Sequence, residues 1–339
     1  MAILITLIGF GIMIFIHELG HFIAAKRFGV LVHEFSIGMG PKIFSFGNGE
    51  TKYSLRLLPI GGFVKLEGEN ELEESDNPRS FSNLAPLKRI VVLFSGALMN
   101  IILGFIIFTI VNISVGITPS VVKDIPEAYS VKQSNFQVGD EILKLNDSNI
   151  NTYNDVSLFM SRYGKDTLDV TIRRNGKIIK LDDANLIKTE NGNMLGVGFR
   201  TEKASFIRCM EFAFYDTTYV SKAVFYAISD LFTGRQSVNS LSGPVEIVSA
   251  VDQVASVDSR YTLLNILMLF GMITVNLGIF NLLPFPALDG GSIIFALYEL
   301  ITRKKVKNEV VGYASMIGFV LLMLLAVWVT AGDIMALFK

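Results

Sequence analysis

The sequence is short of cysteine and of charge, and each shortage excludes a class of protein. Cys209 is the only cysteine among 339 residues, so no internal disulfide and no CxxC motif can form. Charged residues make up 18% of the chain and hydrophobic residues 51%, whereas soluble domains contain roughly 25% charged residues. A disordered chain has the opposite balance. The formal net charge of −1 provides no global attraction to nucleic acid. This composition indicates a multi-pass membrane protein.

Four long stretches without a charged residue predict the membrane spans. In the first, Ala2–Ile16 carries no charge, and the apolar character continues past His17 to Ala25. The others are Ile90–Val122, Tyr261–Leu288 and Val310–Gly332. Each of these three exceeds the roughly 20 residues that a helix needs to cross about 30 Å of hydrocarbon, and the surplus in the second and third stretches predicts tilt or non-helical ends. A signal peptide is the alternative for the first stretch, but the basic pair Lys26–Arg27 follows the apolar core, which favours a retained helix.

Basic residues in the short loops predict the orientation of these spans. They are Lys26, Arg27, Lys88, Arg89, Arg303, Lys304, Lys305 and Lys307. The positive-inside rule places all of them in the cytoplasm. Both termini, and the long segment between the second and third spans, are then expected outside the cell.

The segment after the first span contains a strand pattern and an acidic run. Lys52–Glu67 alternates irregularly around Pro59 and the Gly61–Gly62 pair, which predicts two short strands joined by a turn. This hairpin is either an ordinary cytoplasmic one or one that dips beside the membrane. The acidic run Glu67–Asp76 predicts a solvated loop.

A small soluble domain is predicted from about Ile117 to Thr201, because turn signals there separate short strand-like segments. The expected strands are Glu141–Leu145, Leu168–Arg173, Lys177–Leu181 and Gly196–Phe199. The turn signals are Gly139–Asp140, Asn146–Asp147, Asn175–Gly176 and Asn191–Gly192, and Tyr153–Tyr163 is expected to be helical. Ser205–Phe232 has helical apolar spacing with scattered charges, so we expect an amphipathic helix on the membrane or against the spans.

The first span carries a chemical motif, His17-Glu18-Leu19-Gly20-His21. Two histidines at i and i+4 project from one face of a helix and can hold a metal ion, and Glu18 can reach a metal-bound water. An ionisable group in a membrane helix costs several kcal/mol and is usually functional or paired. The alternative is that these polar residues snorkel near the end of the helix.

A catalytic zinc site of this kind needs a third protein ligand and an open position for water. The metzincin extension is excluded, because Ala24 and Arg27 stand where that class has glycine and histidine. His33 and Glu34 are weaker candidates, since they lie beyond the basic pair in a cytoplasmic stretch.

Asp289 is the favoured third ligand. It follows Pro284 and Pro286, which break the helix in apolar surroundings and free backbone groups that must face protein or water. A carboxylate at that depth needs a partner, and a zinc ion would provide one. The alternative is that Asp289 caps a helix that begins at Gly290–Ser292.

At these residues the chain resembles the site-2 protease family of intramembrane zinc metalloproteases, in particular the bacterial branch that carries a PDZ domain. The matching segments are His17-Glu18-Leu19-Gly20-His21, Gly61–Leu66, Gly96-Ala97-Leu98-Met99-Asn100, Ser242-Gly243-Pro244-Val245 and Asn281-x-x-Pro284-x-Pro286-x-Leu288-Asp289-Gly290. The first and last are highly specific when they occur together.

The resemblance implies roles for individual residues. His17, His21 and Asp289 would bind Zn²⁺, and Glu18 would be the catalytic acid and base. The substrate-binding residues would be Asn281, Gly61, Gly62, Phe63, Val64, Pro284 and Pro286, with the hairpin presenting the substrate as an added strand. Val131–Ile150 resembles the core of a PDZ domain and departs from the usual pattern at Asn135–Phe136 and Asp147, positions that bear on peptide binding rather than on the fold.

The expected fold is therefore a four-helix membrane protein with a membrane-associated β-hairpin and an inserted small α/β PDZ domain. The expected segments are the first transmembrane helix (1–27), a cytoplasmic loop with the hairpin (28–87), the second helix (88–116), an extracytoplasmic PDZ domain (117–203), amphipathic membrane-associated helices (204–258), the third transmembrane segment (259–300) and the fourth helix (301–339).

The predicted function is intramembrane zinc endopeptidase activity on transmembrane segments. The resemblance suggests single-pass anti-sigma factors or remnant signal peptides as substrates, within a lipid membrane and without nucleic acid. Two alternatives are a membrane metal transporter, which would distribute its ligands along a path, and an inactive scaffold that binds peptides, which would tolerate loss of Glu18 or Asp289. His17, Glu18, His21 and Asp289 are all present, which favours the protease over both alternatives.

Overall fold

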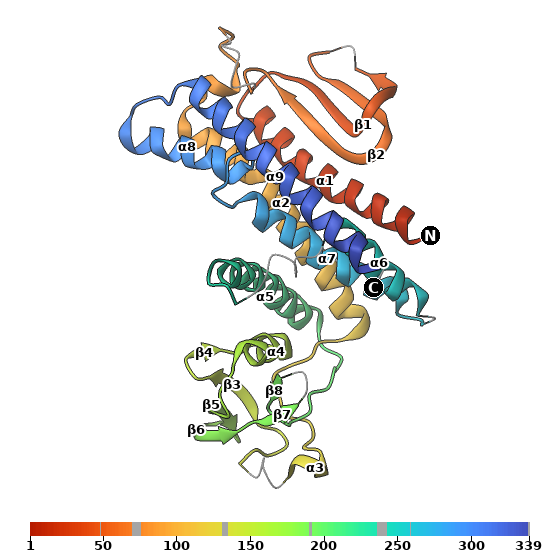
Figure 1. The fold of residues 1–339 in the computed structure, drawn as a ribbon, viewed down its shortest axis with the longest axis vertical. Helices are drawn as coiled ribbons and strands as arrows, with labels where there is room; N and C mark the ends of the chain where they lie inside the picture. Colours follow the sequence, from red (N-terminus) through yellow and green to blue (C-terminus); the bar gives the residue numbers. More distant parts are fainter. Residues whose placement is uncertain are drawn as a thin grey trace. The chain divides into compact units, whose positions relative to one another are not determined.

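The computed structural model describes residues 1–47, 49–69, 76–130, 135–189, 192–235, 243–257 and 259–337. The chain divides into two compact units (Figure 1). The first unit is Met1–Gly104 together with Val224–Lys339, and the second unit is Phe105–Ala223.

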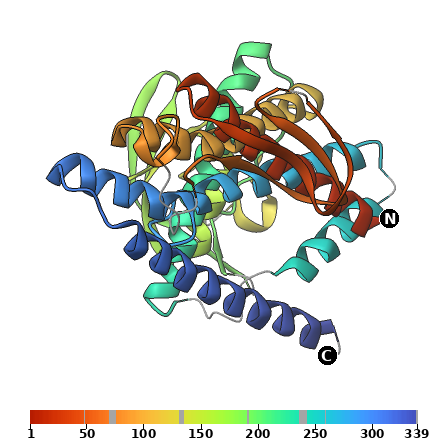
Figure 2. The same cartoon turned by 90° about the horizontal axis from the view of Figure 1, so that it is seen from above.

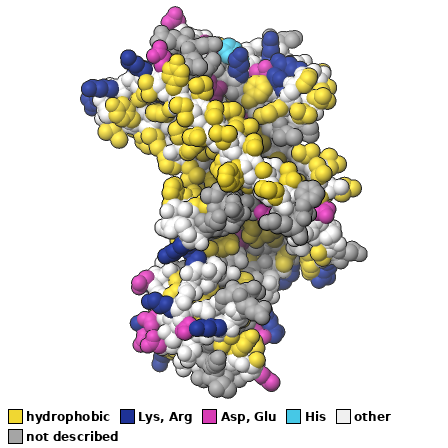
Figure 3. Space-filling model, in the orientation of Figure 1, with side chains coloured by type: hydrophobic (Ala, Val, Ile, Leu, Met, Phe, Trp, Pro, Cys, Tyr) yellow, Lys and Arg dark blue, Asp and Glu magenta, His cyan; other side chains and the backbone are white. Residues whose placement is uncertain are grey.

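Four helices are long and apolar enough to cross a membrane. They are α1 (Ala2–Arg27), α2 (Pro86–Val115), α7 (Thr262–Asn281) and α9 (Asn308–Leu337). Hydrophobic side chains cover much of the visible face over the helices of the first unit (Figure 3). α2 ends at Val115 and α7 at Asn281, so the second and third apolar stretches have non-helical ends, as their length predicted. The number of spans read from the sequence is confirmed by these four helices.

A β-sheet lies beside α1 in the first unit (Figures 1 and 2). It consists of β1 (Val32–Phe46) and β2 (Lys52–Leu66), which pair antiparallel. Phe35 of β1 pairs with Val64 and packs its ring against Phe15 and Phe22 of α1, at centroid distances of 5.7 and 5.0 Å. These contacts fix the end of β2 against the helix that carries the two histidines.

The register shows two strand segments within Lys52–Leu66, and both pair with β1 rather than with each other. Tyr53–Leu55 and Gly62–Val64 both pair with Phe35–Ile37 but in opposite order, so the chain reverses between them as predicted. Gly61, with a φ of +82°, lies in the reversing segment between them. The sequence pattern did not predict β1, which pairs with both segments. The apolar alternation Phe35, Ile37, Met39 was the available signal for β1.

Two further helices complete the first unit. α6 (Pro244–Ser256) contacts α1, α7 and α9, and Val251 is fully buried in a cluster with Met13 of α1 and Phe270 of α7. α8 (Asp289–Thr302) follows the proline-containing link after α7 and contacts α9. A short 3-10 turn, Phe81–Asn83, precedes α2.

The second unit contains a four-stranded antiparallel sheet in the order β4-β3-β5-β6. Its strands are β3 (Glu141–Leu145), β4 (Ser148–Asn149), β5 (Thr167–Arg174) and β6 (Lys177–Asn185); the other elements here are α3 (Glu127–Ser130), α4 (Tyr153–Arg162), β7 (Ile187–Thr189) and β8 (Gly192–Met194). A buried apolar core that includes Ile142, Val170 and Ile172 packs the sheet together. The assignment of this domain as PDZ stays a prediction.

Three predicted strands and the predicted helix of this unit are present, but Gly196–Phe199 is not a strand. Gly198 there forms only an isolated bridge with Asp124. A ladder needs a continuous partner, and the segment opposite provides single bridges instead. The turn predicted at Asn191–Gly192 falls partly on Asn191, which lies outside the described residues.

The expected amphipathic helix is α5 (Phe206–Phe232). Its buried Asp216 accepts hydrogen bonds from the side-chain amides of Asn112 and Asn154, at 3.0 and 3.1 Å. Burial raises the pKa of Asp216, and the two amides oppose that rise. This network ties α4 and the end of α2 to α5.

Candidate metal centre

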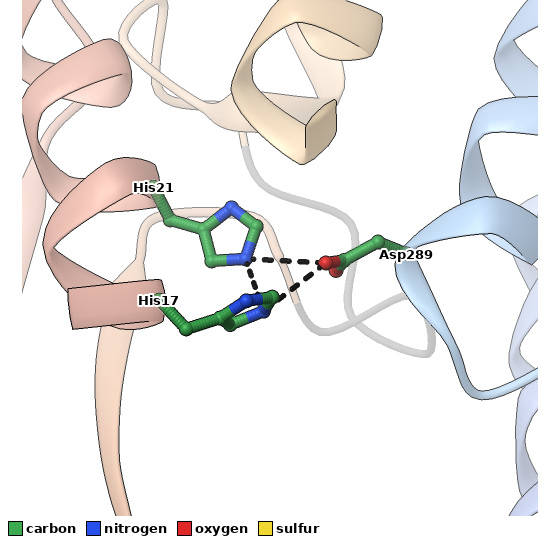
Figure 4. Close-up of side chains that lie close together, drawn as sticks. All are labelled: His17, His21 and Asp289. Atoms are coloured by element: carbon green, nitrogen blue, oxygen red, sulfur yellow. Dashed lines mark hydrogen bonds and ion pairs between the residues drawn. The ribbon is translucent and has the colours of Figure 1, made fainter. Parts of the chain in front are cut away.

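Three side chains that the sequence analysis selected meet in the first unit. His17 and His21 lie one helical turn apart on α1, and Asp289 is the first residue of α8 (Figure 4). The two Nε2 atoms are 3.1 Å apart, and Asp289 Oδ2 lies 3.2 Å from His17 Nε2 and 3.4 Å from His21 Nε2. His17 is buried, and the other two are mostly shielded from solvent.

The spacing of these three atoms fits a tetrahedral zinc ion. Ligand atoms bound at about 2.0–2.1 Å in a tetrahedron lie about 3.3 Å from one another. Asp289 Oδ2 is buried and has no hydrogen-bond donor among the described residues. Two imidazoles and a carboxylate are also ligands that zinc favours. The residues present therefore fit zinc and leave a fourth position for water.

The proline-containing link directs Asp289 toward the histidines. α7 ends at Asn281, and α8 begins after Leu288 without a side-chain cap. The Leu288 amide donates to the carbonyl of Phe285 at 3.1 Å, which closes the link into a compact turn. A Cβ atom on Gly290 would overlap the carbonyl of Leu283, so only glycine permits this close return. The Asp289 side chain thus points at the histidines and does not cap its own helix.

Helix α2 crosses α1 closely at this point because both helices have glycine there. A Cβ atom on Gly20 would lie 2.7 Å from the carbonyl carbon of Ser95 and 2.9 Å from Cα of Gly96. A Cβ atom on Gly96 would lie 2.9 Å from Cε1 of His17 and would overlap Nε2 of His21. The glycine inside the histidine motif therefore allows α2 to pack directly against the two rings.

The other nitrogen of each ring faces α2. His21 Nδ1 lies 2.9 Å from the carbonyl oxygen of Val92, and His17 Nδ1 lies 3.4 Å from the side-chain amide of Asn100. The sequence motifs alone predict no separate role for Asn100. An asparagine in a charge-free span, four residues after Gly96, was the signal that could have singled it out.

Glu18 lies beside one edge of β2. The Val64 amide donates a hydrogen bond to Glu18 Oε2 at 3.1 Å, and the Leu66 amide donates to Glu69 Oε2 at 3.1 Å. The same segment of β2 pairs with β1, since Phe63 lies opposite Ser36 and Gly62 opposite Ile37. Two of its amides are therefore turned away from β1 and toward carboxylates.

A cavity of about 470 Å³ opens beside Asp289. Its wall includes Leu93 of α2, Phe295 of α8 and Phe319 of α9. Arg89 and Glu299 also line it and form a buried ion pair between the start of α2 and α8. The metal centre thus adjoins a space with both apolar and charged walls.

The remaining candidates do not belong to the cluster of three possible ligands. Asn281 is the last residue of α7 and half-buried; Pro284 is exposed and Pro286 half-buried. His33 is paired with Glu67 at 2.5 Å, and Glu34 with Lys42 and Arg56 at 3.0 Å each. The two weaker candidates for a third ligand are thus engaged in ion pairs of their own.

The sequence also matches a known family over nearly its whole length. The model of peptidase family M50 covers residues 5–325. The chain belongs to this family. A protein of Clostridium acetobutylicum is 35% identical over 334 residues, which span 98% of this chain and 97% of the relative. The zinc metalloprotease RasP of Oceanobacillus iheyensis is 31% identical over 422 aligned residues, spanning 97% of each chain.

The protein is accordingly a zinc metalloprotease, and four of its helices are long and apolar enough to span a membrane. The resemblance to site-2 proteases is confirmed, and so are the enzyme class and the metal. A metal transporter and an inactive scaffold lose their support, because the family is one of peptidases.

Proposed function

We propose that this protease cleaves peptide bonds within transmembrane segments, at a zinc ion held by His17, His21 and Asp289. One observation carries the proposal: three zinc-type donor atoms converge within 3.1–3.4 Å, two of them from a helix apolar enough to span the membrane. A zinc site on such a helix can hydrolyse peptide bonds within the bilayer, which are not accessible to soluble proteases.

Glu18 is the proposed acid and base of the reaction. Zinc, when bound there, supplies Lewis acidity that lowers the pKa of a coordinated water toward about 7 and polarises the substrate carbonyl. The Glu18 carboxylate accepts the proton of the attacking water. It then donates this proton to the leaving amine nitrogen, so that one carboxylate serves both halves of the hydrolysis. Its position next to His17 in the chain keeps it beside the site.

The edge of β2 is the proposed docking place for the substrate. A transmembrane helix hides its peptide bonds behind its own hydrogen bonds, so the segment must unwind before it can be cleaved. An added strand on a sheet edge replaces the lost bonds. The amides of Val64 and Leu66, which now donate to Glu18 and Glu69, face away from β1 and are available for this pairing. Gly61, Gly62 and Phe63 belong to the same edge, and Asn281, Pro284 and Pro286 are proposed contacts on the opposite side of the substrate.

The natural substrates are proposed from the family resemblance. They are single-pass membrane proteins such as anti-sigma factors, and signal peptides that remain in the membrane after export. The region 117–203, proposed as an extracytoplasmic PDZ domain, would restrict access by bulky ectodomains, so that shortened substrates enter.

Substitution of the acid–base residue tests the proposal directly. We expect Glu18→Gln to retain stoichiometric zinc and to cleave a reconstituted transmembrane substrate about 10²–10⁴-fold more slowly. Asp289→Ala should lose both zinc and activity. Cleavage at the wild-type rate by the Gln variant would exclude Glu18, and full zinc occupancy in the Ala variant would exclude Asp289.

A backbone substitution tests docking on the edge of β2. Val64→Pro removes an N–H that β1 does not use, so we expect the β1–β2 pairing and zinc content to persist. Loss of one hydrogen bond to the substrate, about 0.5–1.5 kcal/mol, should lower kcat/KM roughly 2- to 13-fold. Val64→Ala is the control, because it shortens the side chain and keeps the N–H. Equal rates for the two variants would argue against strand addition at this residue.

A further inference from the structure

We propose that Asn100 is a positioning residue for the metal centre: its side-chain carbonyl accepts a hydrogen bond from Nδ1–H of His17 in the zinc-bound protein. This bond fixes the ring with Nε2 toward the metal. The inference rests on the proposed role of His17 as a ligand.

Zinc binding selects the tautomer of His17. The atom that faces His21 and Asp289 is Nε2, so Nε2 must be free of a proton when it binds the metal. The single proton of the neutral ring then sits on Nδ1. A buried N–H without an acceptor costs about 1–3 kcal/mol, so Nδ1–H requires a partner inside the protein.

Asn100 is the group that lies at Nδ1. It is 0% exposed, its Nδ2 is 3.4 Å from His17 Nδ1, and its Oδ1 has no hydrogen-bond partner among the described residues. Rotation of the amide by 180° exchanges the places of Nδ2 and Oδ1 without moving the backbone. Oδ1 then lies where Nδ1–H can donate to it. The same side chain can therefore donate to a metal-free ring and accept from a metal-bound one.

The other metal-binding histidine has an equivalent acceptor on the same helix. His21 Nδ1 lies 2.9 Å from the backbone carbonyl of Val92, and that oxygen can only accept. Val92 and Asn100 lie two turns apart on α2, with Gly96 between them against both rings. One helix thus orients both imidazoles, one through its backbone and the other through a side chain.

The proposed role of Asn100 explains why an amide side chain is buried beside His17. The backbone of Asn100 is already used, since its carbonyl accepts from the hydroxyl of Thr274 at 3.4 Å. Leucine has the same branching at Cγ and no acceptor, whereas aspartate keeps an acceptor for Nδ1–H. Outer hydrogen-bond partners of this kind change metal affinity about 10–100-fold.

The test measures zinc affinity of the full-length, detergent-solubilised protein by competition with a chelator. We expect Asn100→Leu to bind zinc about 10–100-fold more weakly than the wild type, and Asn100→Asp to stay within about threefold or to bind more tightly. Thr274→Val is the control, because Thr274 is equally buried and its hydroxyl bonds to the backbone carbonyl of Asn100 rather than to the side-chain amide. It should bind zinc as the wild type does.

Each contrary result has a distinct meaning. Wild-type affinity in Asn100→Leu would overturn the inference, and so would equal losses in the Leu and Asp variants. A loss of the same size in Thr274→Val would assign the effect to packing and would also overturn it. Absence of zinc from the wild-type protein would instead refute the proposed ligand set.

A second measurement needs no variant that might misfold. The chain has only three histidines, so isotope-labelled histidine gives a simple nitrogen NMR spectrum. In the zinc-loaded protein we expect His17 to carry its proton on Nδ1, with exchange slowed relative to His33, whose side chain is 41% exposed. Zinc on Nδ1, or a proton there that exchanges as fast as that of His33, would overturn the inference.

Discussion

At the scale of single residues, the metal centre depends on glycines, because a side chain at these positions would keep the packed segments apart. Gly20 and Gly96 let α2 pack against the histidine rings, and Gly290 lets the chain fold back so that Asp289 faces them. Glycine at a helix interior costs roughly 0.5–1 kcal/mol relative to alanine. The close approach therefore has a thermodynamic cost.

Gly96→Ala should weaken zinc binding. The new methyl group would overlap His21 Nε2, and overpacking of this kind costs about 1–3 kcal/mol, equivalent to a roughly 5- to 150-fold loss of zinc affinity. Competition with a chelator measures the change.

Gly332→Ala on α9 is the matched control for this variant. It is also a helical glycine, but a Cβ atom there would meet no atom within 4 Å. We expect unchanged zinc affinity and equal or slightly greater thermal stability. Tight zinc binding by Gly96→Ala would show that α2 can withdraw from the rings without loss of the site.

At the scale of elements, a buried ion pair joins the helix that orients the histidines to the helix that carries Asp289. Arg89 at the start of α2 contacts Glu299 of α8, and the exposed fractions of the two side chains are 14% and 8%. Glu299 also accepts from the amide of Val306 at 3.1 Å. The pair holds the start of α2 against the end of α8.

Breaking this pair from one side should destabilise the protein. We expect Arg89→Met or Glu299→Leu alone to cost about 3–5 kcal/mol, because each leaves a buried charge without its partner. The double variant should be close to the wild type or more stable. Thermal unfolding in detergent measures all three. A double variant as unstable as the sum of the single ones would show that the two charges do not act as a pair.

At the scale of the whole molecule, the basic loops predict how the chain lies in the membrane. Arg303, Lys304 and Lys305 are exposed at the end of α8. Moving one positive charge across the membrane costs about 2.3 kcal/mol per 100 mV, so these residues should stay in the cytoplasm and both termini outside.

Reporter fusions test this topology. A reporter that is active only outside the cell should be active at either terminus and inactive when inserted at residues 303–305. Replacement of all three basic residues there by glutamine is the control, and it should reduce the preference of this loop for the cytoplasmic side. Activity at the 303–305 insertion in an otherwise unchanged chain would contradict the predicted orientation.

Much of the candidate site could be predicted because its signals are local. The i, i+4 spacing places His17 and His21 on one helical face, and Pro284 and Pro286 mark where the third span breaks before Asp289. β1 was missed because Gly38, Gly40 and Pro41 interrupt its apolar alternation and are themselves turn signals. Gly196–Phe199 was assigned as a strand from its composition, although within the described part of the chain it forms only an isolated bridge with Asp124.

The sequence by itself determined the spans, the paired histidines with Glu18, and the need for a distant carboxylate, because hydrophobic length and helical periodicity are properties of short segments. Only the tertiary structure decided that Asp289 meets the histidines, that Val64 lies at Glu18, and that Asn100 and Val92 face the outer nitrogens. Those contacts join residues far apart in the chain, and they depend on how closely the helices pack, which periodicity does not encode.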